Sequence, residues 1–143
     1  MAKKEVSVKT ELKDNFKLVS KTRDHKAITD QPGKMGDDQG PTPLEYLFIS
    51  LGGCIGTIGK IVAKEKGIDL KNMEVKIDGH LNPNVLFGKN EEERAGFQNI
   101  KVKTKIEADM TEEEKKEFIE EVDERCPISD NISNQSPIKF EIV

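Results

Sequence analysis

The sequence has few cysteines, few aromatic side chains and no long apolar run. Its 143 residues include two cysteines, one tyrosine, six phenylalanines and no tryptophan. The longest uncharged stretch, residues 46–59, is shorter than the roughly 20 apolar residues that a membrane-spanning helix needs. We therefore expect this stretch to lie in a core helix.

Neither sign of charge dominates. The 23 Lys and Arg residues and 27 Asp and Glu residues give a net charge of −4. This balance provides no attraction to phosphate backbones or anionic membranes, so neither nucleic acid nor a membrane is an expected partner. The lysines near the N-terminus precede no apolar segment of the kind found in secretory signals, which predicts a cytoplasmic protein.

The length predicts a single domain, residues 1–143. Hydrophobic residues make up 34% of the chain and charged residues 35%. A monomer of this composition would have a thin core, and association of subunits would relieve that shortage.

Residues 1–42 have the pattern of short antiparallel strands followed by a loop. Apolar and polar residues alternate in the first segment, which predicts a strand with one buried face. Three strands are expected, at residues 5–12, 16–21 and 26–29. The Gly, Pro and Asp residues of 30–42 predict a loop, and Thr42 is a suitable N-cap for a helix.

A long central helix is expected from Pro43 to Lys66, because proline favours the first turn and Gly67 can end a helix in the left-handed conformation. At 100° per residue, Cys54 lies on an apolar face of this helix. The opposite ridge carries small residues, namely Gly52, Gly56, Gly59 and Ala63. Each interior glycine costs roughly 1 kcal/mol relative to alanine, so we expect another backbone to approach this ridge closely.

The rest of the chain combines strands with a second helix. Three further strands are expected, at residues 73–77, 96–108 and 136–143. A polar connection covers residues 82–95. Thr111 and Glu114 form a capping box that opens the helix, and Pro127 ends it. The whole pattern predicts an α+β fold.

The two cysteines, Cys54 and Cys126, are too far apart in sequence for a CxxC redox or zinc motif. Cys126 continues the apolar stripe of Phe118 and Val122, so the two thiols can meet in the core. If they meet, a Cys54 thiolate can attack a peroxide and become a sulfenic acid, which Cys126 converts to a disulfide for an external thiol to reduce. The alternative is that both cysteines only pack, as free cysteine often does.

A reactive Cys54 needs a nearby cation, because burial raises the pKa of a thiol and the thiolate is the nucleophile. Arginine is preferred because it stays charged when partly buried. The chain has three arginines, Arg23, Arg94 and Arg125. A metal site is not expected, because His25 and His80 lack the spacing of metal ligands.

Two segments resemble motifs of the OsmC/Ohr family of osmotically induced and organic-hydroperoxide-resistance proteins. They are GPTPLEYLFISLGGC (residues 40–54) and RCPIS (residues 125–129). Their order and separation also fit, and the resemblance covers nearly the whole chain. It implies an OsmC-like fold, with antiparallel sheets around a long central cysteine-bearing helix, in an intertwined homodimer.

The resemblance also implies a cysteine-based peroxidase that reduces organic hydroperoxides without a metal, flavin or other cofactor. Cys54 would then be the attacking thiol and Cys126 the resolving thiol. Arg23 would be the activating cation, because residues 23–27 are similar to the family segment that carries one. The implied partners are a second subunit, a small electrophilic substrate and a thiol reductant, which is a lipoylated protein in the hydroperoxide-resistance branch.

One position departs from that branch, which has a glutamate directly after the motif proline. Here Leu44 follows Pro43. Glu45 lies about 180° round the helix from Cys54 and roughly 13 Å along it, so it cannot hold Arg23 against Cys54 in the same subunit. The chain is more similar to the OsmC-like branch. A second function therefore stays open, a non-catalytic dimer that binds a small molecule or senses oxidants.

Overall fold

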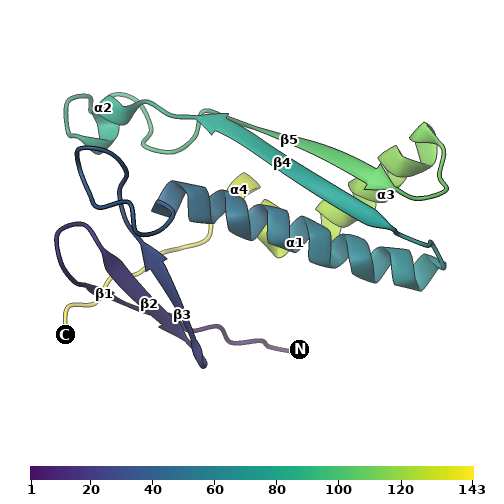
Figure 1. Cartoon of the computed structure of the whole chain (residues 1–143), viewed down its shortest axis with the longest axis horizontal. Coiled ribbons are helices and arrows are strands. Elements are labelled where there is room, and N and C mark those ends of the chain that lie inside the picture. The colour runs from purple at the N-terminus through teal and green to yellow at the C-terminus, as the bar shows by residue number, and fades with distance from the viewer. The chain divides into compact units, whose positions relative to one another are not determined.

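The computed structural model describes all 143 residues and divides them into two compact units, residues 1–49 and 50–143. Its elements are β1 (Lys9–Leu12), β2 (Leu18–Thr22), β3 (His25–Thr29), α1 (Pro43–Lys66), β4 (Asn72–His80), α2 (Pro83–Leu86), β5 (Asn99–Glu107), α3 (Glu112–Arg125) and α4 (Pro127–Ser133) (Figure 1). The predicted α+β class is confirmed. The assignment of residues 1–143 to one domain stays a prediction.

The first unit contains an antiparallel sheet in the order β1-β2-β3. The three strands were predicted, and a two-residue turn at Arg23 and Asp24 joins β2 to β3. β1 is shorter than expected, and its predicted buried face is wrong. Val6 keeps 75% of its surface exposed and Leu12 keeps 68%, because no element of the first unit covers them.

The loop after β3 is organised around the buried carboxylate of Asp30. The backbone N–H groups of Gln31 and Gln39 donate to its two oxygens at 2.7 and 3.1 Å. Gly40 lies against β3, where an added Cβ would be only 2.3 Å from the carbonyl oxygen of Ile28. The loop therefore has a defined conformation that leads directly into α1.

α1 has the predicted bounds because local signals fix both of its ends. The Glu45 N–H donates to Thr42 Oγ1 at 3.2 Å, and the Thr42 N–H donates to Glu45 Oε1 at 2.8 Å, which forms a capping box. At the other end Gly67 has a φ of 68°, and the Ile68 N–H donates to the Ala63 carbonyl at 2.8 Å.

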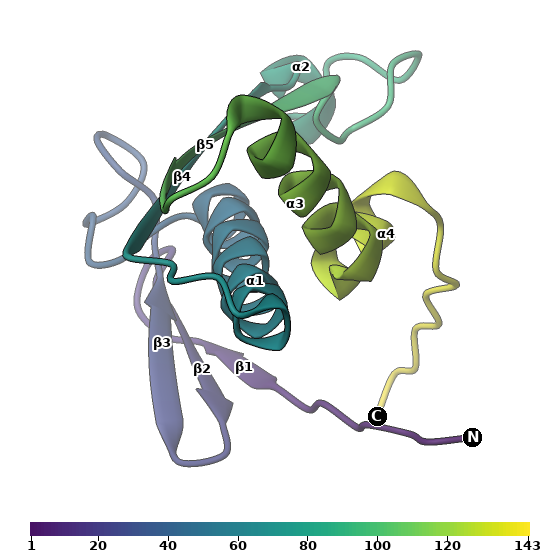
Figure 2. The same ribbon diagram turned by 90° about the vertical axis from the view of Figure 1, so that its right-hand side faces the viewer.

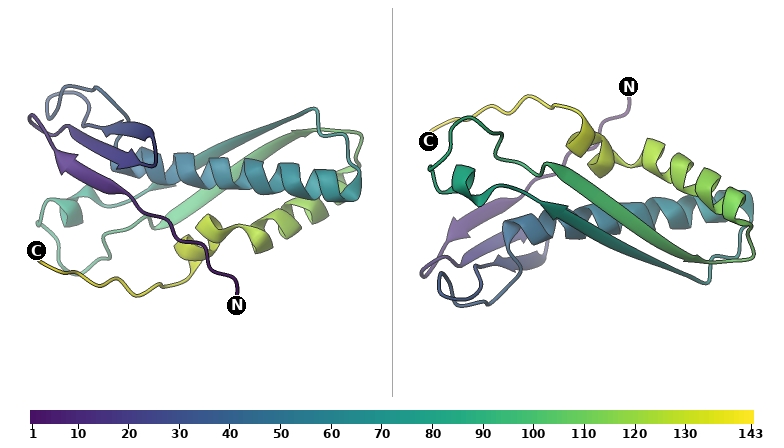
Figure 3. Two further views of the ribbon diagram at one scale, coloured as in Figure 1. Left: turned by 90° about the horizontal axis from the view of Figure 1, so that it is seen from below. Right: turned by 90° about the horizontal axis from the view of Figure 1, so that it is seen from above.

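α1 is also the core helix of the second unit. By length and composition alone it would suffice to cross a membrane. Its buried residues nevertheless pack with Ile106 of β5 and Phe118 of α3 into one cluster, to which α1 contributes Leu51, Ile55, Val62 and Ala63. β4 and β5 pair antiparallel along their full length, and α1 and α3 lie on the same side of them (Figures 2 and 3).

The glycine ridge of α1 faces side chains, so the predicted close approach of another backbone is wrong. A Cβ on Gly59 would meet the Met73 sulfur at 3.0 Å, and one on Gly52 would meet Ile77 Cδ1 at 3.6 Å. Nothing lies within 4 Å of the corresponding position on Gly56. Inward-facing residues of β4 thus fill the space beside Gly52 and Gly59.

Two short helices were not predicted, and one predicted strand is absent. α2 lies in the connection between β4 and β5, and α4 follows α3 directly. Pro127 does not merely end α3, since it also occupies the first turn of α4. Residues 136–143 form no strand, because a strand needs a hydrogen-bonding neighbour and none pairs with them here.

The Asp30 carboxylate predicts a pH-dependent stability. Burial alone would raise its pKa, but hydrogen bonds from the backbone N–H groups of Gln31, Gln39 and Asp37 hold it below its usual range. A lowered pKa contributes stability that is present above the unfolded-state pKa and is lost as the pH falls through the folded-state value. We expect Asp30→Asn to lower the free energy of unfolding at pH 7.

The difference between Asp30→Asn and the wild type should shrink as the pH falls below about 4, the pKa of an unperturbed aspartate. Urea unfolding of both proteins at a series of pH values measures it. A stability difference that stays the same from pH 7 to pH 3 would show that the charge of Asp30 is not what stabilises the loop.

Candidate active site

The two cysteines meet inside the second unit. Cys54 lies in the middle of α1, Cys126 lies between α3 and α4, and their sulfurs are 2.8 Å apart. Both are free thiols, and Cys126 has only 1% of its surface exposed. The separation is greater than the roughly 2.05 Å of a disulfide bond. The predicted meeting of the thiols is confirmed, while their catalytic roles stay predictions.

The apolar stripe of α3 positions Cys126. Phe118, Val122 and Cys126 follow one another at intervals of four residues, and all three are buried. At Cys126 the backbone becomes extended, with φ −86° and ψ 109°, so the chain leaves α3 and enters α4. The Ser129 N–H then donates to Cys126 Sγ at 3.4 Å. The core and the start of α4 therefore both hold this sulfur.

The groups around Cys54 in the second unit do not lower the pKa of its thiol overall. Burial raises the pKa of its thiol above the ordinary value, and the hydrogen bond with Cys126 adds to the rise. A backbone hydrogen bond from Ile128 acts in the opposite direction, and no cation is among the groups that shift this pKa. A thiolate at Cys54 therefore needs a positive charge from outside these contacts.

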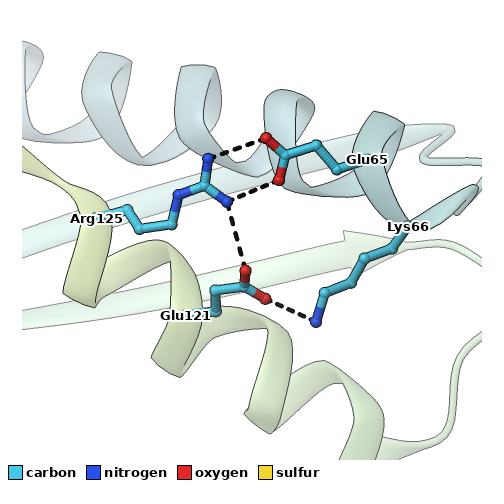
Figure 4. Close-up of polar contacts among 4 residues, drawn as sticks. All are labelled: Glu65, Lys66, Glu121 and Arg125. Atoms are coloured by element: carbon cyan, nitrogen blue, oxygen red, sulfur yellow. Dashed lines mark hydrogen bonds and ion pairs between the residues drawn. The ribbon is translucent and has the colours of Figure 1, made fainter.

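Arg125, although next to Cys126 in sequence, is held by two carboxylates (Figure 4). Its guanidinium donates to the two oxygens of Glu65 at 2.8 and 3.1 Å and to Glu121 at 3.4 Å. Lys66 pairs with the other oxygen of Glu121 at 2.6 Å. These four residues form what we call the Arg125 network. Its acidic members offset the charge of Arg125.

The other two arginines lie in connecting segments. Arg94 belongs to the β4–β5 connection and lines a polar hollow with residues 131–137. Arg23 occupies the β2–β3 turn of the first unit, where its side chain is exposed and its φ is 52°. Its assignment as the activating cation stays a prediction.

The carboxylate of Glu45 is already engaged in capping α1. The backbone and hydroxyl of Thr42 hydrogen-bond to Glu45 and keep its pKa below the usual range. Glu45 is therefore a helix-capping residue here. Leu44, at the position that carries a glutamate in the hydroperoxide-resistance branch, has 39% of its surface exposed.

An apolar hollow of about 340 Å³ lies beside Cys126 but contains neither cysteine. Ser129 and Val122, on either side of Cys126 in sequence, both line it. Its apolar walls come from α1, β5, α3 and α4, and comprise Leu51, Ile55, Ile100, Val102, Ile119 and Ile132. Sequence reasoning missed the part from α4, for which Pro127 followed by Ile128 and Ile132 was the available signal.

No group of three or more His, Cys, Asp and Glu side chains is arranged to hold a metal ion. His25 lies in β3 and His80 in β4, and both are exposed.

Comparison with known proteins supplies the family. The OsmC-like protein family matches residues 36–141, whereas no curated protein matches the chain. An OsmC-like protein from Mycoplasma pneumoniae has a similar structure, with a TM-score of 0.83 and 21% identity over 94% of this chain and 91% of that one.

Two further structures are similar at lower identity. An OsmC-like protein from Vibrio cholerae has a TM-score of 0.74 and 14% identity, over 99% of this chain and all of the other. A protein from Legionella pneumophila called organic hydroperoxide resistance protein OsmC has a TM-score of 0.69 and 17% identity, over 92% and 91% of the two chains. The family match and the shared fold together establish that the chain belongs to the OsmC-like protein family.

Proposed function

We propose that the protein is a thiol-dependent reductase of organic hydroperoxides. The observation that carries the proposal is the 2.8 Å separation between the sulfurs of two free cysteines from different helices. The OsmC-like family membership supports it, as does the name of the Legionella pneumophila protein, which refers to organic hydroperoxide resistance.

The proposed chemistry uses Cys54 first and Cys126 second. The Cys54 thiolate attacks the peroxide, the O–O bond breaks, and the substrate leaves as an alkoxide that takes a proton to become an alcohol. Cys54 is thereby oxidised to a sulfenic acid. Cys126 attacks this sulfur, a disulfide forms and water leaves. An external dithiol, such as a lipoylated protein, then reduces the disulfide by exchange and restores both thiols.

Cys126 suits the resolving role because it lies against Cys54 and is almost fully buried. Peroxide reaches a buried sulfur with difficulty, whereas Cys54 is only partly buried. The proposal therefore assigns the attack to Cys54. No metal or other cofactor is invoked, because both electrons come from sulfur.

The proposal assigns activation of Cys54 to Arg23. Burial and the contact with Cys126 raise the pKa of Cys54, and no cation is among the groups that shift it. Arg125 is neutralised by its carboxylate partners, which leaves the exposed Arg23 and Arg94. The similarity of residues 23–27 to the family segment that carries an arginine favours Arg23.

We propose further that the active form is a cytoplasmic homodimer. Apolar residues alternate with polar ones near both ends of the chain but are not covered. Val8 keeps 58% of its surface exposed, Ile138 78% and Phe140 91%. These segments have the pattern of strands that lack a neighbour, and a second copy of the chain would provide one.

A second candidate function is a non-catalytic dimer that binds a small apolar or electrophilic molecule, or that senses oxidants. The apolar hollow beside Cys126 favours it, because the hollow is large enough for a small ligand and excludes both sulfurs. Leu44 in place of a glutamate also favours it. The two functions differ in whether peroxide consumes the thiols.

Thiol consumption tests the reductase. We expect the reduced wild type to lose both thiols when treated with one equivalent of cumene hydroperoxide, because one turnover ends in the Cys54–Cys126 disulfide. Cys54→Ser should lose none, and Cys126→Ser should stop at a sulfenic acid that dimedone traps. Free-thiol titration and mass spectrometry measure these outcomes. Wild-type thiols that survive excess peroxide would rule out the reductase and leave the binding or sensing dimer.

Arg23→Ala tests the source of the activating charge. Removing a cation from beside a thiol raises the thiol pKa by about one unit or more, so iodoacetamide alkylation of Cys54 at pH 7 should slow at least about tenfold. The pH midpoint of alkylation should move upward. Arg94→Ala is the matched control and should leave the midpoint unchanged. If Arg23→Ala has the wild-type midpoint, Arg23 is not the activating residue.

Analytical ultracentrifugation tests the dimer. We expect a species of twice the 16.1 kDa chain mass. Phe140→Asp should weaken the dimer by about 1–3 kcal/mol, because it places an unpaired charge where an apolar side chain would be covered. Lys139→Asp, at the adjacent polar position of the same alternating segment, is the control. Equal effects of the two substitutions would exclude residues 136–143 as a subunit contact.

A further inference from the structure

We infer that Arg125 is a positioning residue for the resolving step, and that it keeps Cys126 within reach of Cys54 by tying the end of α3 to α1. The inference rests on the proposed peroxide chemistry and concerns its second step, in which the disulfide forms.

The Arg125 network lies on the same face of α1 as Cys54. Glu65 follows Cys54 by 11 residues, which places it about 20° round the helix and roughly 16 Å along it. Arg125 directly precedes Cys126, so the end of α3 contacts this face of α1 at two separate places, Glu65 and Cys54. Figure 4 shows the first of these contacts. Two contacts restrain sliding and rotation of α3 better than one.

The ion pairs of the network hold the end of α3 against α1, and we call this arrangement the clamp. Arg125 binds both oxygens of Glu65, which is the arrangement that fixes a guanidinium most firmly. Glu121, one turn earlier on α3, accepts from Arg125 and pairs with Lys66 of α1. α1 and α3 each contribute one acidic and one basic residue. The cation of each helix therefore pairs with a carboxylate of the other helix.

The network favours the charged forms of its two carboxylates. The hydrogen bond from Arg125 holds the pKa of Glu65 below its usual range, and Lys66 followed by Arg125 does the same for Glu121. The side chains are between 31% and 52% exposed, so the contribution is that of a surface network, and salt should screen it.

Disulfide formation is sensitive to position, which is why such a clamp matters. Cys126 must approach the sulfur of Cys54 from the side opposite the leaving hydroxide, and the new bond is only about 2.05 Å long. While α3 is displaced, a second peroxide can oxidise the Cys54 sulfenic acid to a sulfinic acid. The clamp therefore favours the disulfide over this irreversible product.

The position of Arg125 should affect the placement of Cys126 and not the reactivity of Cys54. Because Arg125 is not among the groups that shift the pKa of Cys54, loosening it should leave the attack of Cys54 on peroxide unchanged. Only the formation of the disulfide should slow. A general loss of structure would slow both steps.

Glu65→Gln in the full-length protein tests the inference, with Glu112→Gln as the matched control. Glu112 pairs with Lys115 in the first turn of α3, far along the helix from Cys126. Rapid-quench experiments with cumene hydroperoxide follow peroxide loss, disulfide formation and sulfinic acid by mass spectrometry. We expect Glu65→Gln to consume the first peroxide at the wild-type rate and to form the disulfide about fivefold more slowly, as loss of a surface ion network predicts.

Sulfinic acid should accumulate in Glu65→Gln and not in Glu112→Gln. In 1 M KCl the wild type should approach the rate of Glu65→Gln, which itself should change little. Equal rates of disulfide formation in Glu65→Gln and the wild type would overturn the inference while leaving the reductase intact.

Equilibration of the disulfide with glutathione tests the clamp without peroxide. The effective concentration of the two thiols for each other should be about fivefold lower in Glu65→Gln than in the wild type. If this difference is found but peroxide leaves the wild-type thiols intact, the reductase fails and the positioning role stands. An effective concentration in Glu65→Gln equal to that of the wild type would likewise overturn the positioning role.

Discussion

The packing of α3 against α1 is the interaction on which the candidate site depends. Phe118 and Val122 of α3 are buried in one cluster with Val62 of α1. This contact brings Cys54 and Cys126 together although 72 positions separate them in the sequence. Without the burial of those apolar side chains, no other packing contact would hold the two sulfurs together. The thiol pair is therefore a consequence of the core.

The same burial works against the chemistry that the pair would perform. Burial places the sulfurs in contact but raises the pKa of the Cys54 thiol, which disfavours the thiolate. A protein that uses this pair as a nucleophile and a resolving thiol must therefore bring in a positive charge separately. Arg125, which is next to Cys126 in the sequence, is already engaged in ion pairs with Glu65 and Glu121. The contacts that bring the two sulfurs together thus supply no activating charge.

The sequence predicts features that neighbouring residues determine. The ends of α1 and the start of α3 depend on residues within five positions of one another, and Thr42, Gly67 and Thr111 mark them correctly. α4 was missed because a proline can both end one helix and begin the next. Residues 136–143 were assigned to a strand because they alternate, but alternation does not supply the neighbour that a strand requires.

The thiol pair was predictable from helical periodicity. The ion pair between Glu65 and Arg125 was missed, although periodicity gave part of the information. Periodicity places Cys54 on an apolar face and Cys126 on an apolar stripe, and these faces meet. The same periodicity places Glu65 on the face of Cys54. A carboxylate on a face that packs against another helix indicates a cation on that helix, because an unpaired charge there is unfavourable. Arg125 fits that role, but nothing in the local sequence links residues 60 positions apart. Only the register of α3 on α1 makes the pairing evident.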